Sequence, residues 1–427
     1  MPSSKKTENV FKKFLDQPSS SAVLNSKLLL LTHGLDFSFA QLRQNFPQLK
    51  EKYKVNKIKV SDRHQVSTQS GQRDFIPDEL ILADSRNKSV CKVFYRPSSA
   101  FVLGWQEGEF IISEKDSRQE FPIKIEPVKL PNFSKLKYQD VYLDEFISVV
   151  GQDRLSIIPF DGCSNWPQGL PCLFCGANPS RLGFSGIKPD VYSLEGEHQN
   201  NCSQWWQAKK KTMMSGISLA LQKFSELDEL TPHFHFNLIG GNLPDMDFCW
   251  KLSLEVAELV REYIDLKKID SHFNMMAPMN FKLIDRAKEI GFTNMDMNLE
   301  CFDRSYFQKV CPGKAKQIGY QKIREALAYS LKSFGRGQVR SNFVLGAEPF
   351  SRLLAGAEEL GQQGIVADYT IFFPRPGSRW HDKPTPDPNQ VLDFTEQLVK
   401  IQKKHGLHPF CCSLSSRSSI ANEVFDL

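Results

Sequence analysis

Short apolar runs alternate with amphipathic stretches along the chain from about residue 155 to residue 405. This alternation is typical of repeated βα units, which place their strands side by side in a parallel sheet. We expect strands at residues 155–160, 234–239, 271–276, 294–299, 338–345 and 367–373, and helices at residues 205–226, 247–262, 281–290, 318–333, 351–362 and 389–405. Six units are fewer than the eight of a closed TIM barrel. The predicted fold class is therefore α/β, with a partial, open (β/α)6 TIM-like barrel.

Four of the predicted strands carry polar residues at alternate positions, although a strand covered by helices should be almost entirely apolar. These residues are His233, His235 and Asn237 in the second strand, His272 and Asn274 in the third, Asp296, Asn298 and Glu300 in the fourth, and Arg340 and Asn342 in the fifth. Alternate residues of a barrel strand point into the lumen. Because unpartnered polar groups are costly to bury, we expect a polar lumen that holds a ligand, with these groups near the carboxyl ends of the strands. The alternative is a sheet that lacks helices on one side, so that its polar face is solvated.

The length of 427 residues suits two or three domains. Residues 1–20 are polar and rich in serine and lysine, so we expect a disordered N-terminus. Residues 21–150 predict an accessory α+β domain, with a helix at 39–53 and strands at 90–95, 100–103 and 109–113. The partial barrel is expected to occupy residues 151–405, and a C-terminal extension residues 406–427.

Charge and hydropathy exclude several classes of protein. The net charge of +5 is mild for this length, so a nucleic-acid partner is unlikely on these grounds. No stretch approaches the roughly 18 apolar residues that a membrane span needs, and the charged N-terminus has no apolar signal segment. We therefore expect a cytoplasmic protein without a membrane partner.

Ten cysteines occur, and three of them, Cys163, Cys172 and Cys175, fall directly after the first predicted strand. In a reducing compartment such cysteines are metal ligands or free thiols more often than disulfides. Three thiolates are one fewer than an ordinary [4Fe–4S] site uses, so one iron would keep an open position. The competing interpretation is a structural zinc site completed by His198 or Cys202.

Further motifs follow the later strands, and each lies at the carboxyl end of its strand. Gly240-Gly241-Asn242 follows the second, Asn298-Leu299-Glu300 the fourth and Val344-Leu345-Gly346-Ala347-Glu348 the fifth, while Phe373-Pro374-Arg375-Pro376-Gly377-Ser378 ends the sixth. With the three cysteines, and with Phe174 just before the last of them, region 155–410 resembles the radical S-adenosylmethionine (SAM) superfamily. The sequence pattern of this region is nearest to that of the biotin-synthase-like members of the superfamily. The family spacing is usually Cys-x3-Cys-x2-Cys, whereas this chain has Cys-x8-Cys-x2-Cys.

This resemblance implies an enzyme with two cofactors, a [4Fe–4S] cluster on Cys163, Cys172 and Cys175, and SAM. It implies reductive cleavage of SAM to a 5′-deoxyadenosyl radical, which abstracts a hydrogen atom from a small-molecule or peptide substrate, with a flavodoxin or ferredoxin as the reductant. The SAM-contacting residues would be Phe174, Gly240, Gly241, Asn298, Glu300, Gly346 and Glu348.

Three more residues are candidates for the site. Arg340 could bind a carboxylate of SAM or of the substrate through two parallel hydrogen bonds, or could form a structural ion pair. Cys301 and Cys311 are candidate hydrogen donors to a substrate radical, and the alternative for both is an inert, buried thiol. The alternative function is a zinc-stabilised, non-catalytic binding protein that uses the same cysteines.

Overall fold

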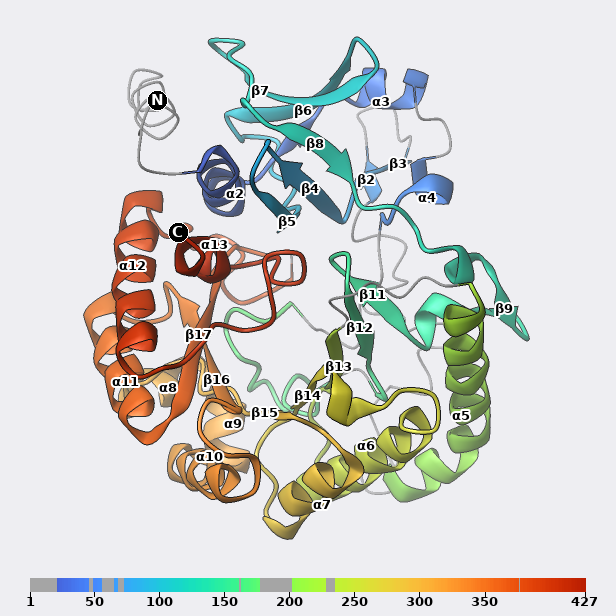
Figure 1. The fold of residues 1–427 in the computed structure, drawn as a ribbon, viewed down its shortest axis with the longest axis vertical. Coiled ribbons are helices and arrows are strands. Elements are labelled where there is room, and N and C mark those ends of the chain that lie inside the picture. The colour runs from blue at the N-terminus through green and yellow to red at the C-terminus, as the bar shows by residue number, and fades with distance from the viewer. Residues whose placement is uncertain are drawn as a thin grey trace.

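Two large sheets dominate the computed structural model, with one stacked above the other in Figure 1. The structure describes residues 21–45, 49–55, 65–67, 73–160, 163–176, 202–227, 235–375 and 377–427. Residues 1–20, for which disorder was expected, lie outside these ranges. His198 and His233 lie outside them as well. Within them, the structure contains no helix with the length and hydrophobicity of a membrane span.

The upper sheet has six strands in the order β1-β6-β7-β8-β4-β5. All of its pairings are antiparallel except that of β1 with β6. Two short hairpins accompany it, β2 with β3 and β9 with β10. The bounds are β1 Asp36–Phe37, β2 Gln65–Ser67, β3 Arg73–Phe75, β4 Glu79–Ala83, β5 Lys88–Lys92, β6 Phe101–Gln106, β7 Glu109–Glu114, β8 Lys124–Pro127, β9 Lys137–Tyr138 and β10 Val141–Tyr142.

The helices of this N-terminal region differ from the expectation. Helix α2 (Ala22–His33) was not predicted, and ten of its twelve residues are buried. A surface helix is recognised by a stripe of apolar residues along one face. Helix α2 has no such stripe, because it is buried on nearly all sides. Within the segment predicted as one helix at 39–53, the structure describes α3 (Phe39–Asn45) and α4 (Leu49–Lys52), and residues 46–48 lie outside the described ranges.

The lower sheet confirms the predicted fold class. Its order is β11-β12-β13-β14-β15-β16-β17, so the last six strands follow the chain in sequence. Those six are parallel, and β11 adds an antiparallel edge. The sheet curls into a half-barrel with its helices outside (Figure 1). The bounds are β11 Ser148–Val150, β12 Arg154–Ile157, β13 His235–Ile239, β14 Asp270–Asn274, β15 Asn294–Asp296, β16 Val339–Leu345 and β17 Ile365–Ile371.

The barrel helices agree with the six predicted segments to within a few residues. The exception is an added pair, α8 and α9, between β15 and α10, where no helix was expected before residue 318. The bounds are α5 Cys202–Glu226, α6 Met246–Val260, α7 Lys282–Ile290, α8 Arg304–Val310, α9 Pro312–Gln317, α10 Tyr320–Phe334, α11 Phe350–Gln363 and α12 Pro388–Lys404.

Local sequence explains where these helices begin and end. The carboxylate of Asp245 accepts a hydrogen bond from the Phe248 amide and caps the start of α6. Asp387 caps α12 in the same way, ahead of a proline at the first helical position. Helix α11 stops at Gly364, whose φ of 92° lies in the left-handed region that glycine favours.

Alternation along the strands separates the core from the lumen. In β13, Phe236 and Leu238 are fully buried, and Phe236 contacts Phe292. In β14, Phe273 packs against Trp250 of α6. These apolar side chains form the layer between sheet and helices, so the intervening polar residues point into the barrel.

The C-terminal residues after α12 pack between the two sheets. The amides of Val90 and Lys92 in β5 donate to the carbonyls of Ser413 and Arg417, at 3.0 and 2.8 Å. Helix α13 (Ala421–Phe425) lies beside α12 and α2 in Figure 1. The C-terminal segment therefore joins the upper sheet to the half-barrel.

Candidate functional site

The loop that carries the three cysteines follows β12 and is attached to the segment after β13. Cys163 forms a parallel bridge with Asn242, and the Ser164 amide donates to the Asn242 carbonyl at 2.8 Å. The predicted glycine pair, Gly240 and Gly241, comes directly before this bridge. The cysteine loop and the glycine pair are thus neighbours at the carboxyl end of the barrel, as expected.

Three more backbone hydrogen bonds fix the cysteine loop above the later strands. The Leu173 amide donates to the Val310 carbonyl at 2.9 Å, and the Gly313 amide of α9 donates to the Leu170 carbonyl at 3.1 Å. The Trp380 amide, beyond β17, donates to the Leu173 carbonyl at 3.0 Å. A Cβ at Gly313 would lie only 2.4 Å from the Leu170 carbonyl oxygen, so glycine is needed for this close approach.

The Cys163 thiol interacts electrostatically with those of Cys172 and Cys175. Burial, together with these two thiols, raises the pKa of Cys163 to about 12. A hydrogen bond with Cys311, together with burial, raises the pKa of Cys172. Cationic iron offsets this cost, because a coordinating thiol is deprotonated by its metal. The donor set therefore suits a bound metal centre.

The spacing of the thiols suits a cluster better than a single ion. The thiols of Cys163, Cys172 and Cys175 do not all lie within 4.8 Å of one another. Among the described residues, groups of three His, Cys, Asp or Glu ligand atoms that lie this close together occur around His235. One zinc ion needs its ligands that close, because its bonds to sulfur are about 2.3 Å long. In a [4Fe–4S] cluster the cysteines bind different irons and can be farther apart. Cys202, offered for zinc, lies instead beside Asp245 and Cys249.

A buried ion pair lies next to the cysteine loop and was not predicted. Lys314 of α9 contacts Glu300 at 2.5 Å, and both residues are more than nine-tenths buried. Burial lowers the pKa of Lys314, but the Glu300 carboxylate and the thiols of Cys172 and Cys311 outweigh it, so the net shift is upward. Lys314 therefore keeps a positive charge beside Cys172. Glu300, predicted to contact SAM, has this lysine as its partner.

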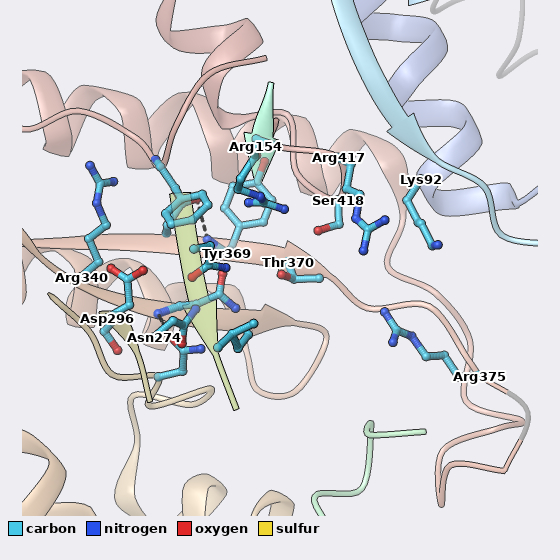
Figure 2. A pocket seen from close by; sticks show the side chains of 18 residues that line it. Lys92, Arg154, Asn274, Asp296, Arg340, Tyr369, Thr370, Arg375, Arg417 and Ser418 are labelled. Atoms are coloured by element: carbon cyan, nitrogen blue, oxygen red, sulfur yellow. Dashed lines mark hydrogen bonds between the residues drawn. The ribbon is translucent and has the colours of Figure 1, made fainter. Parts of the chain in front are cut away.

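The barrel encloses a cavity of about 360 Å³, shown in Figure 2. Its walls confirm the predicted polar lumen, because they include Asn237, Asn274, Asp296, Asn298, Arg340 and Asn342. The expectation that the polar groups gather at the carboxyl strand ends was wrong in part. Arg340 is the second residue of β16 and His235 the first of β13, so both lie at amino ends.

Positive charge predominates in this cavity. Lys92, Arg154, Arg340, Arg375 and Arg417 line it, against two carboxylates, Asp296 and Asp368. The Nε atoms of Arg154 and Arg340 are buried and have no hydrogen-bond partner within the described part of the chain. An anion in the cavity would satisfy both donors.

The cavity runs the length of the strands. In Figure 2, Arg340 and Asp296 lie at one end of the cavity. Arg375 lies at the other end, beyond the tip of β17. Burial lowers the pKa of Arg375 and the Cys175 thiol raises it, so Arg375, which lines the cavity, also lies near the cysteine loop. The floor includes Phe410, whose ring is 4.4 Å from that of His272. The cavity thus extends from Phe410 toward the cysteine loop.

No ion pair of Arg340 occurs among the described residues, although its charge helps to lower the pKa of Asp270. Its Nη1 donates a hydrogen bond to the His408 carbonyl at 3.3 Å, and its guanidinium lies 5.6 Å from the centre of the Phe410 ring. Its Nε is left for a ligand.

The other predicted cofactor contacts are placed as follows. A Cβ at Gly240 would lie 2.8 Å from the Phe160 ring, so this close approach requires glycine. Asn298 lines the cavity and accepts a hydrogen bond from the Asn342 amide at 3.2 Å. Gly346 has a φ of 98°, in the left-handed region. Phe174 is half-buried against the core.

Glu348 and the two predicted hydrogen donors lie away from the cavity walls. Both oxygens of Glu348 accept hydrogen bonds from backbone amides, those of Phe302 and Asp303. Cys301 and Cys311 are fully buried beside Cys172, and neither is among the side chains that line the cavity. Their role as hydrogen donors stays a prediction.

Sequence reasoning missed Arg154, Asp368, Arg375 and Phe410. A signal existed for Asp368, which pairs with Asn342 across β16 and β17 and interrupts an apolar strand. Arg154 begins β12, and the strand was predicted to start one residue later. Phe410 comes from the C-terminal segment, where no periodic pattern places a side chain in the barrel.

The chain shares partial similarity with known proteins. No family model matches the sequence. Over 133 residues the chain is 29% identical to bacteriochlorophyllide c C-7(1)-hydroxylase of Chlorobaculum limnaeum, a match that covers 31% of this chain and 33% of the relative. The chain therefore matches about a third of the length of that relative.

Solved structures with a similar fold include two that are described as radical SAM enzymes. Coproporphyrinogen III oxidase of Escherichia coli is 11% identical, with 64% of this chain and 57% of that chain covered and a TM-score of 0.40. A radical SAM methyltransferase of Sphaerobacter thermophilus is 13% identical, with 87% and 79% covered and a TM-score of 0.40.

Proposed function

We propose that this protein is a radical SAM enzyme whose substrate is a small molecule with an anionic group. The observation that carries the proposal is the position of the three thiols, which lie at the carboxyl end of a half-barrel, above a polar cavity. Barrels of this kind place their chemistry at that end. Two buried arginine Nε donors in the cavity lack a partner among the described residues, which is expected of a ligand site.

The cofactors would be a [4Fe–4S] cluster, held by Cys163, Cys172 and Cys175, and SAM. Bound together and reduced, they would supply a 5′-deoxyadenosyl radical for hydrogen abstraction. Gly240 and Gly241 lie beside the cysteine loop, where their backbone can approach SAM closely. Asn298 lines the cavity and would contact SAM from there.

The rest of the chain positions the substrate and excludes water. The cavity volume of about 360 Å³ lies at the lower end of the range of small-molecule sites, which favours a small molecule over a folded peptide. Its walls come from the barrel, from Lys92 of the upper sheet and from the C-terminal segment. Such enclosure protects a reactive species from side reactions. None of the ten cysteines forms a disulfide among the described residues, which agrees with a reducing cytoplasm. A flavodoxin or ferredoxin would be the electron donor.

Purified anaerobically, the protein is expected to be brown, to contain about four irons per chain, and to form 5′-deoxyadenosine from SAM after reduction. The measurement is chromatography of the nucleoside products after incubation with dithionite and SAM. A colourless protein that binds one zinc and leaves SAM intact would contradict the proposal and support a zinc-stabilised binding protein.

Loss of the Arg340 guanidinium is expected to weaken the binding of anions in the cavity. A charge-assisted hydrogen bond contributes about 1.5–3 kcal/mol, so Arg340→Met should raise the Kd of a carboxylate ligand about 10- to 150-fold. The probe is a panel of small di- and tricarboxylates and their methyl esters, with calorimetry as the measurement. The matched control is Arg286→Met, because Arg286 is half-exposed on the outer helix α7. Equal binding of acids and esters would contradict an anionic substrate.

A further inference from the structure

A second group of metal-binding side chains lies at the opposite end of the barrel from the cysteine loop. Asp153 directly precedes β12, and His235 is the first residue of β13. Cys412 reaches them from the C-terminal segment. Asp153 and His235 are buried, at 3% and 9% exposed, and Cys412 is half-buried.

The distances between these side chains fit one metal ion. Cys412 Sγ lies 3.2 Å from Asp153 Oδ2, and His235 Nε2 lies 3.7 Å from the same oxygen. All three ligand atoms lie within 4.8 Å of one another. Ligands bound tetrahedrally to zinc, with bonds of about 2.0–2.3 Å, are about 3.3–3.8 Å apart.

The histidine is oriented as a metal ligand. Its Nδ1 contacts the Asp270 carboxylate at 3.0 Å, which places the proton on Nδ1 and leaves the lone pair of Nε2 toward Asp153 and Cys412. This Nε2 atom is buried and has no hydrogen-bond partner within the described ranges. A buried polar atom without a partner is costly, and a bound cation would remove that cost.

We infer that Asp153, His235 and Cys412 bind one Zn²⁺ ion, with a water molecule as the remaining ligand. A mixed set of thiolate, imidazole and carboxylate favours zinc over Mg²⁺ or Ca²⁺, which prefer oxygen alone. Two anionic ligands balance the charge of the ion. The site shares no residue with the three-cysteine loop, so it is independent of the proposed function.

The ion would fasten the C-terminal segment to the amino ends of the barrel strands. Two residues before Cys412, the Phe410 amide donates to the Asp368 carboxylate at 2.7 Å, and the Phe410 ring lies against Arg154 and Arg340 in the cavity. Zinc at Cys412 would therefore hold the floor of the cavity in place.

The test compares the metal content of the full chain with that of two serine variants. Wild-type protein, expressed with zinc and iron and purified anaerobically, is expected to contain about one zinc per chain in addition to its iron. Cys412→Ser should lose most of this zinc and keep its iron. Cys411→Ser is the matched control, because Cys411 groups with His235 and Asp270 and is not part of the proposed ligand set; it should keep both metals.

Three outcomes would overturn the inference: wild-type protein without zinc, zinc that survives Cys412→Ser, or equal loss of zinc in the two variants. Zinc could also enter the three-cysteine loop. The measurement is therefore repeated on Cys163→Ala/Cys172→Ala/Cys175→Ala protein, which should still bind one zinc whether or not the proposed function is right.

A second variant covers the case in which Cys412→Ser does not fold. Asp270→Asn keeps the size of the side chain that orients His235 but weakens its interaction, and should lower zinc affinity about 10- to 100-fold in competition with a chelator. Unchanged affinity in this variant would contradict the assignment of His235 as a ligand.

Discussion

Protein with the substitution Cys172→Ala is expected to form no 5′-deoxyadenosine above background and to retain little iron. Cys172 is nearly fully buried, and its thiol interacts with that of Cys163. With two thiolates left, the cluster would lose a ligand and become labile. The measurements are iron content after anaerobic purification and nucleoside products after reduction with SAM.

Cys202→Ala is the matched control for this substitution. Cys202 is the cysteine offered for a four-ligand zinc site, but its electrostatic neighbours are Asp245 and Cys249. The control should keep both iron and activity. Loss of metal in Cys202→Ala, or full activity in Cys172→Ala, would contradict the assignment of the three-cysteine loop. Circular dichroism spectra matching the wild type would show that both variants fold.

Glu79→Gln is expected to lower the free energy of unfolding by about 3–5 kcal/mol, the cost of removing one partner from a buried ion pair. Glu79 is fully buried, and its carboxylate pairs with Lys54 and with Arg417 of the C-terminal segment. It also accepts a hydrogen bond from the Gly151 amide at 2.9 Å. The variant leaves the buried Lys54 and the partly buried Arg417 with less compensation.

Urea unfolding, followed by tryptophan fluorescence, measures this loss. Glu126→Gln is the matched control, because Glu126 lies on the neighbouring strand β8 and forms an exposed pair with Lys124. The control should change stability by less than about 0.5 kcal/mol. A loss below about 1 kcal/mol for Glu79→Gln would show that the buried charges around it relax or gain water.

The barrel could be predicted from the sequence because its period is regular. Each βα unit has a short apolar strand followed by an amphipathic helix, and six such units in a row leave little choice of architecture. The polar lumen could also be predicted, because Asn237, Asn274 and Asn342 interrupt apolar strands at alternate positions. The cysteine loop was found because three cysteines lie within a short segment directly after the first strand.

The rest depends on contacts between segments that are distant in the sequence. Helix α2 is buried on nearly all sides, and its buried residues include the polar Asn25, Ser26 and Lys27, so it has no amphipathic pattern. Lys314 gave no sign that it would be buried, because its partner Glu300 lies on another element. Arg417 and Phe410 belong to an irregular C-terminal segment, and only the folded chain brings them to the cavity.

The dependence of the cavity on this segment has a consequence for biosynthesis. A nascent chain that has emerged only as far as α12 already has its cysteine loop and six barrel strands, but it lacks Phe410 and Ser416–Ser418, which complete the chamber wall. Cluster ligands are thus translated before the compartment is sealed. Productive radical chemistry would have to wait until the C-terminal segment has emerged and packed against the barrel.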